Sequence, residues 1–233
     1  MSKLTILSGA GISAESGLKT FRDAGGLWEQ YPVMEVASYE GWLKNPGLVL
    51  EFYNQRRKQA CQAVPNAGHR ILAELEQWFQ VTVITQNVDA LHEKAGSSRV
   101  IHLHGELSKV RSSTHPSYIR EIGDKEIHIG DCCPMGGQLR PHIVWFGESV
   151  PLFEEAIPYV EEADYFAIVG TSLNVYPAAG LLGYFPLNRP VFVIDPNEVP
   201  VPTSRKAVFI RKGAGEGAAV LKELLLKLEK LTP

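Results

Sequence analysis

The sequence of 233 residues predicts an α/β protein with a Rossmann-like, doubly wound parallel sheet and a small inserted module. Short apolar runs of strand length alternate with helical patterns, which is typical of parallel sheets covered by helices. Several of these runs end in glycine or polar residues, and ligands of such sheets bind at the strand ends. From 105 to about 140 the alternation stops, and polar residues dominate.

Most predicted strands are short, buried in character and rich in β-branched residues. They cover residues 4–7, 81–85, 100–104, 143–146, 165–169, 191–195 and 207–210. Helices are expected over residues 12–16, 33–37, 39–44, 46–63, 67–79, 90–95, 177–185 and 217–231. Ser38, Pro46 and Asn66 are suitable helix-start residues, and Gly96 is a suitable helix end.

These elements suggest how the chain is organised. Residues 1–104 and 141–233 are expected to form the Rossmann-like domain, with a helical insertion over 33–65. Residues 105–140 form the small module. We expect Cys61, on a predicted helix, to be a small core residue.

Composition excludes several classes of protein. The net charge of −3 gives no basic surface for nucleic acid or an anionic membrane. No apolar run approaches the roughly 20 residues of a membrane span, and no signal peptide is evident. Three cysteines, an odd number, argue against a secreted disulfide scaffold. We therefore expect a cytoplasmic protein without nucleic-acid or membrane partners.

The first strand runs into a glycine turn with nucleotide-binding character. Gly9-x-Gly11-x-x-Ala14 fits the relaxed dinucleotide fingerprint, and the start of the following helix suits a pyrophosphate. A purely structural glycine turn would explain the same pattern. No second strand with a terminal acid follows, as it would in a dehydrogenase. Residues 20–29 instead suggest a flap that carries an aromatic, a cation and a carboxylate.

Six stretches, in one order, resemble the sirtuin family of NAD-dependent protein deacylases. They are residues 9–29, 85–96, 103–107, 139–151, 170–180 and 213–215, so the resemblance covers nearly the whole chain. It implies that NAD is consumed as a co-substrate. The acyl oxygen of lysine attacks the ribose as nicotinamide leaves, and the acyl group ends on ADP-ribose.

The resemblance also assigns residues. His104 matches the general base, which activates a ribose hydroxyl. Asn87 is catalytic and, with Gln86 and Asp89, holds the ribose and the nicotinamide carboxamide; Phe21 shields the reactive ribose. The residues assigned to NAD are Gly9, Ala10, Gly11, Ser13, Phe21, Arg22, Trp28, Gln86, Asn87, Asp89, Gly170, Thr171, Ser172, Asp195, Asn197 and Ala214.

Each assignment has a structural alternative. His104 could be an ordinary structural histidine, which is our reading of His102. Asn87 and Asp89 could cap a helix, and Ser13 and Ser172 could both cap helices and contact phosphate. Many family members carry asparagine where Asp195 stands, so its assignment carries less weight.

The resemblance implies that an acyl-lysine protein substrate binds as an added β-strand. The residues assigned to this substrate are Tyr53, Arg56, Val144, Phe146, Gly147, Glu148, Leu173 and Val175. Val144 and Phe146 would line the lysine channel. Tyr53 and Arg56 lie three residues apart, on one helix face.

Tyr53 and Arg56 bear on the acyl group. They match the Tyr-x-x-Arg pair of the branch that removes succinyl and malonyl groups. A phenol and a guanidinium can hold a distal carboxylate, and the small Ala24 would leave room for it. A core tyrosine beside a solvated arginine is the alternative. Deacetylation is a possible second activity.

The inserted module departs from the family. Most sirtuins hold a structural zinc there with two pairs of cysteines, but here only the adjacent Cys132 and Cys133 are present, and Ser112 stands where the first ligand is expected. His115, His128 or Asp131 could complete a set, although the spacing fits no known ribbon. We expect no zinc. Two rival functions are a mono-ADP-ribosyltransferase of the same fold and a catalytically silent NAD-binding regulator.

Overall fold

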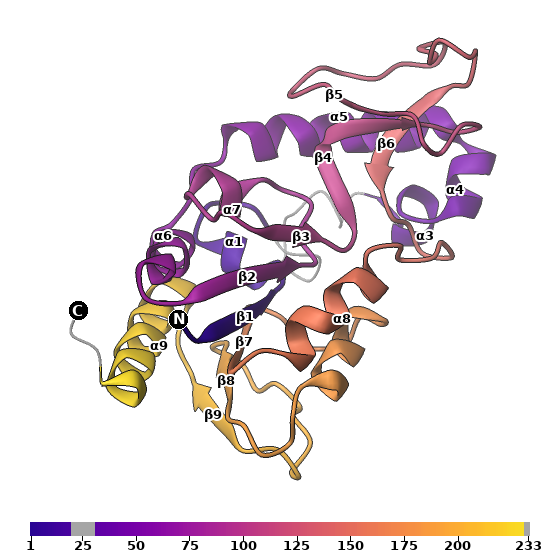
Figure 1. Cartoon of the computed structure of the whole chain (residues 1–233). Helices are drawn as coiled ribbons and strands as arrows, with labels where there is room; N and C mark the ends of the chain where they lie inside the picture. Colours follow the sequence, from indigo (N-terminus) through magenta and orange to yellow (C-terminus); the bar gives the residue numbers. More distant parts are fainter. Residues whose placement is uncertain (20–30, 231–233) are drawn as a thin grey trace.

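The computed structural model describes residues 1–19 and 31–230. Within them, a six-stranded parallel sheet has the strand order β3-β2-β1-β7-β8-β9 (Figure 1). Its strands are β1 Lys3–Ser8, β2 Gln80–Thr85, β3 Val100–His102, β7 Tyr165–Val169, β8 Val191–Ile194 and β9 Ala207–Ile210. The order runs outward in both directions from β1, so the predicted doubly wound sheet is confirmed.

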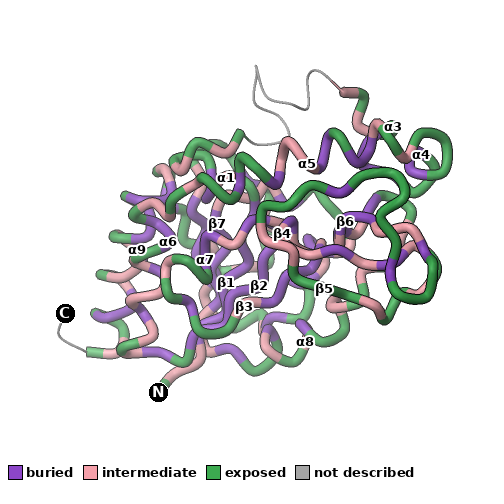
Figure 2. The backbone as a smooth tube through the Cα atoms, turned by 90° about the horizontal axis from the view of Figure 1, so that it is seen from above, coloured by how far each residue is buried: buried purple, intermediate pink, exposed green. Residues whose placement is uncertain are grey.

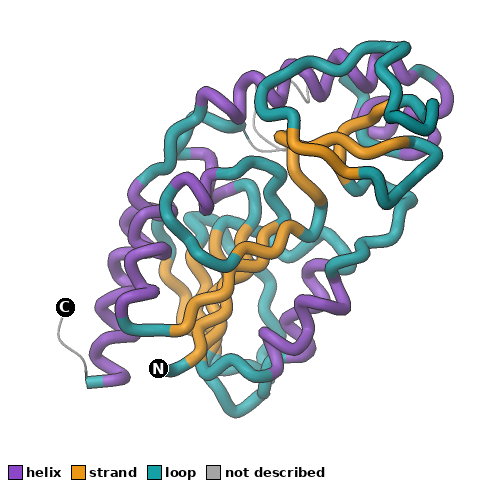
Figure 3. The backbone as a smooth tube through the Cα atoms, turned by 45° about the horizontal axis from the view of Figure 1, so that its top comes forward, coloured by secondary structure: helices purple, strands orange, loops and turns teal. Residues whose placement is uncertain are grey.

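Helices cover both faces of this sheet (Figure 3). On one face, α6 (Ala67–Glu74) and α9 (Ala214–Glu229) pack with it through side chains such as Leu72 and Leu221. On the other face lie α8 (Phe153–Glu161) and the 3₁₀ helix η2 (Ala178–Tyr184). The strands between them are buried (Figure 2). Burial on both faces explains why they read as continuous apolar runs.

A smaller unit lies beyond the carboxyl ends of these strands (Figure 1). It contains an antiparallel sheet of β5 (Ile119–Glu121), β4 (Gly105–Ser112) and β6 (Leu139–Ile143). Three helices pack with it, namely α3 (Val33–Val36), α4 (Tyr39–Lys44) and α5 (Pro46–Gln62). Phe52 of α5 and Leu107 of β4 belong to their shared apolar core.

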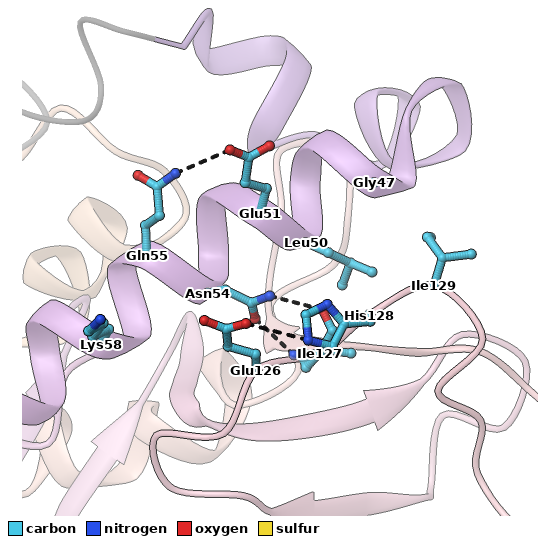
Figure 4. Close-up of a pocket in the computed structure, with 10 residues that line it drawn as sticks. All are labelled: Gly47, Leu50, Glu51, Asn54, Gln55, Lys58, Glu126, Ile127, His128 and Ile129. Atoms are coloured by element: carbon cyan, nitrogen blue, oxygen red, sulfur yellow. Dashed lines mark hydrogen bonds and ion pairs between the residues drawn. The ribbon is translucent and has the colours of Figure 1, made fainter.

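Polar side chains of α5 fix this helix on the smaller unit. The fully buried Arg57 donates from Nε to the carbonyl oxygen of Leu107 over 2.6 Å and from Nη1 to Asn54 Oδ1 over 2.7 Å. Asn54 forms two hydrogen bonds with the backbone of Ile127, of 2.9 and 3.0 Å (Figure 4). The helix is therefore held by directional bonds as well as by apolar contacts.

The helix-start predictions at Ser38, Pro46 and Asn66 are confirmed. Ser38 Oγ accepts a hydrogen bond from Gly41 N, and Pro46 occupies the first turn of α5. Asn66 Oδ1 accepts bonds from the first backbone N–H groups of α6. Ser38 and Asn66 thus satisfy donors that a helix start otherwise leaves unpaired, whereas Pro46 has no N–H group to satisfy, and Asn45 Oδ1 accepts from Leu48 N at the start of α5.

The carboxyl end of α5 is capped by a distant lysine. Lys94 Nζ donates to the carbonyl oxygens of Ala60, Cys61 and Ala63 over 3.0–3.2 Å. An ammonium group at this end also opposes the negative pole of the helix dipole. The prediction of a buried Cys61 is wrong, because its side chain lies one position around the helix from the buried Ala60 and is exposed.

The predicted strand over residues 143–146 is wrong. Ile143 ends β6 in the antiparallel sheet, which therefore extends past position 141, where we expected the Rossmann-like domain to resume. Phe146 forms an isolated bridge with Ser38. Trp145 is buried in the core of the smaller unit, while Val144 is partly buried and Phe146 is exposed, so residues 144–146 form a loop that Trp145 anchors.

Several helices differ from their predicted bounds. The first is the single turn α1 (Gly11–Ala14), and α7 covers only Leu91–Lys94. Helix α6 ends at Glu74 and continues as the 3₁₀ turn η1 (Leu75–Gln77). The region 177–185 is 3₁₀ rather than α-helical, and α9 starts at Ala214 instead of 217. Helix α8, which contains Pro158, was not predicted.

Across the described residues, no helix is both long and apolar enough to cross a membrane.

Candidate functional site

A cavity of about 1510 Å³ lies at the carboxyl ends of β1, β2, β7 and β8 and reaches α5. The residues assigned to NAD that line it are Gly9, Ala10, Gly11, Ser13, Gln86, Asn87, Asp89, Gly170, Thr171, Ser172, Asp195, Asn197 and Ala214. Ligand pockets usually measure about 300–1,000 Å³. This cavity is therefore large enough for a dinucleotide beside a second ligand.

Two glycine turns meet at the base of the cavity. Gly9 N donates to the carbonyl oxygen of Val169, and Gly11 N donates to that of Gly170 over 2.8 Å. A Cβ atom on Gly11 would lie 2.7 Å from Gly170 Cα, which is closer than real Cβ contacts. Gly170 also has a φ of +61°. The turns after β1 and β7 thus need glycine in order to pack together.

Gly170→Ala should destabilise the protein by at least about 2 kcal/mol and weaken NAD binding. The left-handed backbone costs about 1–2 kcal/mol for a residue with a Cβ atom. In addition, this atom would lie 2.3 Å from Ile12 N. Gly183→Ala is the matched control, since its Cβ meets nothing within 4 Å. Thermal melts and NAD titrations of both variants test this, and equal melting temperatures would contradict it.

Asn87 and its neighbours connect the strand ends. Asn87 Nδ2 donates to the carbonyl oxygen of Gly9 over 3.2 Å and to Ser13 Oγ over 3.1 Å. Ser13 Oγ in turn donates to Asp89 Oδ2 over 3.0 Å, and Gln86 Nε2 donates to Thr171 Oγ1 over 3.0 Å. The polar residues after β2 are thereby held against the turns after β1 and β7.

A buried hydrogen-bond chain below Asn87 was not predicted. Asn87 N donates to Thr85 Oγ1, which also accepts from Ser8 Oγ over 2.9 Å. Ser8 Oγ lies 2.9 Å from His92 Nε2. Burial, with His69 nearby, lowers the pKa of His92 to about 3, so its ring is neutral. Ser8 and Thr85 are polar residues at the ends of two apolar strands, and this position was the signal in the sequence that could have predicted the chain.

Asp89 is largely enclosed. Burial raises the pKa of its carboxyl group, although hydrogen bonds from Leu91 N and Ser13 Oγ act in the opposite direction. The bond from Leu91 N, of 3.1 Å, is the helix-capping alternative that we considered. Since one carboxylate oxygen accepts from Ser13 at the cavity wall, Asp89 combines this capping with a place in the site.

His104 lines the cavity directly after β3. Its Nδ1 atom lies 3.1 Å from the carbonyl oxygen of Gln86, which can only accept, so Nδ1 carries the proton and Nε2 has a free electron pair. Burial lowers the pKa of His104 from 6.5, and the bond to Gln86 partly opposes this. At neutral pH the imidazole is therefore uncharged and able to accept a proton.

His102 has a structural environment. Its two ring nitrogens lie 2.9 Å from the carbonyl oxygen of Asn87 and 2.7 Å from Glu93 Oε1. Burial disfavours the charged ring, but Glu93 outweighs it and raises the pKa of His102. Both ring nitrogens of His102 are thus engaged by described residues of the protein. In His104 only Nδ1 is engaged in this way.

Tyr53 and Arg56 line the cavity from α5. Tyr53 is 1 % exposed, and the guanidinium carbon of Arg56 lies 5.8 Å from the centre of its ring. Burial raises the pKa of the Tyr53 phenol, while Arg56, Trp145 and Arg140 around it act in the opposite direction. The phenol is thus a protonated hydrogen-bond donor at neutral pH. A guanidinium stays charged, so the pair suits an anion.

The segment after β6 forms another part of the wall. Val144 N donates to the carbonyl oxygen of His104, and Phe146 N to that of Ala37. Val144, Trp145, Phe146, Gly147 and Glu148 line the cavity, and Phe146 remains 49 % exposed.

The Glu148 carboxylate holds this segment in place. It accepts bonds of 2.7 and 2.9 Å from Arg140, bonds of 2.9 and 3.0 Å from Arg111, and one of 2.9 Å from Trp145 N. Sequence reasoning assigned Glu148 to the substrate and missed both arginines, which lie in the apparently irregular module.

Two of the remaining assigned residues, Leu173 and Val175, lie in the described part of the chain, and the others do not. Val175 lines the cavity, whereas Leu173 is buried in the core on the α8 side and is not among the cavity-lining residues that the structure describes. Phe21, Arg22, Ala24 and Trp28 lie outside the described residues. Their assignments stay predictions.

The described ranges contain no group of three or more His, Cys, Asp or Glu residues arranged to hold a metal ion. At the expected zinc position, Cys133 Sγ lies 3.4 Å from Ser112 Oγ. The Ser112 hydroxyl also accepts hydrogen bonds from the backbone of Thr114 and His115. Hydrogen bonds of Ser112 thus connect the end of β4 with Cys133 and with the turn at residues 114–115.

Comparisons with known proteins agree with this geometry. The sequence profile of the Sir2 family matches residues 9–177. An "NAD-dependent protein deacylase" of Bacteroides thetaiotaomicron is 58% identical over 231 residues, which cover 97% of this chain and 99% of the relative. One of Helicobacter pylori strain J99 is 57% identical over 196 residues, covering 84% of this chain and 83% of the relative.

Solved structures extend the comparison to ligands. A mutant Sir2 homologue in complex with ADP-ribose has a TM-score of 0.89 and 37% identity, covering 99% of this chain and 94% of that one. A complex of a Sir2 homologue with NAD has a TM-score of 0.87 and 38% identity, covering 97% and 90%.

Proposed function

This chain belongs to the Sir2 family and is an NAD-dependent protein deacylase, and we propose that it prefers lysine acyl groups that end in a carboxylate, such as succinyl and malonyl groups. The main support for this preference is the Tyr53–Arg56 pair on the cavity wall. A partly buried cation beside a phenol donor would be poorly used by an acetyl group, which has no charge to pair with.

NAD supplies the ribose carbon to which the acyl oxygen is transferred. We propose that Asn87 and Asp89 orient the ribose and the nicotinamide carboxamide, since both line the cavity on a loop fixed by the Ser13 hydroxyl. His104 takes a proton from a ribose hydroxyl through its free Nε2 atom. The assignments of Gly9, Gly11, Gly170 and the other cavity-lining residues to NAD belong to the same proposal.

The acyl-lysine peptide is proposed to bind as a strand between two cavity-lining segments, 147–148 and 174–175. Phe146 and Val175 are partly exposed there, and apolar side chains suit the aliphatic part of lysine. Because Leu173 is buried, we propose that it contributes to the peptide site only through its backbone.

Arg56→Met should raise KM for a succinyl-lysine peptide roughly 10- to 100-fold and leave the acetyl-lysine peptide of the same sequence nearly unaffected. The variant keeps an unbranched side chain but removes a charged hydrogen-bond partner of the acyl carboxylate. NAD-dependent turnover of both peptides by the native protein and the variant measures this. The neighbouring, exposed Lys58→Met is a matched control that removes a cation from the same helix.

The outcomes separate the alternatives. A native preference for succinyl that Arg56→Met removes supports the proposal. A native preference for acetyl that the variant leaves unchanged would contradict it and favour an ordinary deacetylase. Absence of turnover with either peptide would favour the silent NAD-binding regulator.

A further inference from the structure

His92 is a buried histidine to which the proposed reaction gives no role. The residue is 1 % exposed, and its Nδ1 atom has no hydrogen-bond partner among the described residues. An unpaired polar atom in the interior costs free energy, and an apolar side chain of similar size would avoid this cost. Stability alone does not account for an imidazole here, so the bond of its other nitrogen is the feature to explain.

The other ring nitrogen, Nε2, starts a chain of three hydrogen bonds that ends at Asn87. Nε2 lies 2.9 Å from Ser8 Oγ, which donates to Thr85 Oγ1 over 2.9 Å, and Thr85 Oγ1 accepts from Asn87 N over 3.0 Å. Because the Ser8 hydroxyl gives its own proton to Thr85, Nε2 donates to Ser8 and Nδ1 carries no proton. Ser8 and Thr85 are fully buried, so water does not compete for these bonds.

This chain closes a ring through three elements. Ser8 ends β1, Thr85 ends β2, and His92 belongs to α7, the helix that follows the loop of Asn87. The backbone thus leaves the end of β2, passes Asn87 and enters α7, and the imidazole then connects α7 back to the two strand ends. The loop of Asn87 is therefore fixed at its start by the strands and at its end by His92.

The position of the Asn87 backbone decides what its side chain offers to a ligand. Nδ2 donates to the carbonyl oxygen of Gly9 and to Ser13 Oγ, which uses both of its protons. Oδ1 is then the acceptor that Asn87 can present to a ligand in the cavity. Both bonds are lost if the backbone moves, and a displacement of about 1 Å in a reacting group can lower a rate about 100-fold.

From this arrangement we infer that His92 is a positioning residue, which holds Asn87 in place for the NAD ribose by fixing the Ser8 and Thr85 hydroxyl groups. The inference rests on the proposed role of Asn87 and is independent of the acyl preference. His69 packs edge-on against His92, with 5.0 Å between the ring centres. Neither ring nitrogen of His69 has a hydrogen-bond partner among the described residues, so His69 adds packing but no link to the chain.

His92→Leu should lower kcat roughly 10- to 100-fold on succinyl-lysine and acetyl-lysine peptides alike and leave KM for both peptides nearly unchanged. Exchange of labelled nicotinamide into NAD should fall in parallel, because Asn87 acts while the bond to nicotinamide breaks. His92→Gln should restore most of the rate, since its amide nitrogen can donate to Ser8 in place of Nε2. His69→Leu is the matched control, which removes a buried imidazole beside the chain and should keep the native rate.

A second variant separates positioning from a loss of folded structure. Ser8→Ala breaks the chain at the next link, so the double variant with His92→Leu should lose no more rate than the more impaired single variant. Losses that add would overturn the inference, and so would a native rate in Ser8→Ala. A fall in melting temperature of more than about 4 °C that His92→Gln does not restore, together with an unrestored rate, would show a merely structural role and overturn it as well.

Asn87→Ala distinguishes failure of the inference from failure of the proposed function. Loss of nicotinamide exchange in Asn87→Ala, beside native exchange in His92→Leu, would leave the role of Asn87 standing and overturn only the inference about His92. Native exchange in Asn87→Ala would overturn both. Loss of exchange in both variants, with rescue by His92→Gln, is the expected result.

Discussion

His104→Ala should lower kcat for deacylation about 100- to 10,000-fold, the usual contribution of a general base. Since we propose that the imidazole takes a proton from a ribose hydroxyl, the loss should be confined to steps after nicotinamide leaves. Exchange of labelled nicotinamide into NAD, in the presence of acyl-peptide, should therefore continue. Rapid-quench analysis of nicotinamide release and of acyl transfer separates the two steps.

The pH dependence of the native protein provides an independent check. Only the neutral imidazole accepts a proton, and the pKa of His104 lies below 6.5 because of burial. The His104-dependent rate should be constant near pH 7 and should decrease only on acidification below 6.5. His128→Ala, at an exposed histidine, is the control and should behave like the native protein. Equal loss of exchange and transfer in His104→Ala would contradict the assignment.

Glu148→Gln should lower the free energy of unfolding by about 3 kcal/mol at pH 7. The change removes the negative charge between Arg111 and Arg140, and breaking one partner of a largely buried ion pair costs about 3–5 kcal/mol. Urea unfolding measures the loss. Glu155→Gln is the matched control, since Glu155 is an exposed residue on α8 and should show a change below about 0.5 kcal/mol.

The effect of Glu148 should depend on pH in a defined direction. Burial alone would raise its pKa, but the bonds from Arg140 and Trp145 N outweigh burial and lower the pKa below 4.5. The carboxylate thus contributes its full stabilisation above the unfolded pKa, and this is lost as pH falls through the lower folded pKa. The difference between native protein and Glu148→Gln should shrink below pH 4.5. A difference that is constant from pH 7 to 3 would contradict this account.

Much of the main sheet could be predicted because its strands are buried on both faces. Residues 165–169 and 191–194 are uninterrupted apolar runs, and a run of this kind has few alternatives to a central parallel strand. The segment 143–146 is equally apolar, but after Ile143 it forms a loop that is anchored by the buried side chain of Trp145. Its burial against α4 and α5 depends on contacts with residues far away in the sequence, and periodicity carries no information about these contacts.

The candidate site divides in a similar way. Gly9, Asn87 and Gly170 could be predicted because each follows a strand, and the topology of the sheet brings strand ends together. Arg140 and Trp145 could not, since their positions depend on the antiparallel sheet, whose pairing includes an irregular register between Glu106 and Val110. Leu173 was assigned to the substrate together with its sequence neighbours. The structure separates them, because Ser172 and Asn174 line the cavity while Leu173 packs in the core.

His104 lies at the junction of the two sheets, between β3, which ends at His102, and β4, which starts at Gly105. Its carbonyl oxygen accepts from Val144 in the smaller unit, while its ring donates to Gln86 after β2 of the parallel sheet. The proposed general base is therefore hydrogen-bonded to both the parallel sheet and the smaller unit. A change in how the smaller unit packs on the parallel sheet would therefore move the imidazole relative to the ends of the parallel strands.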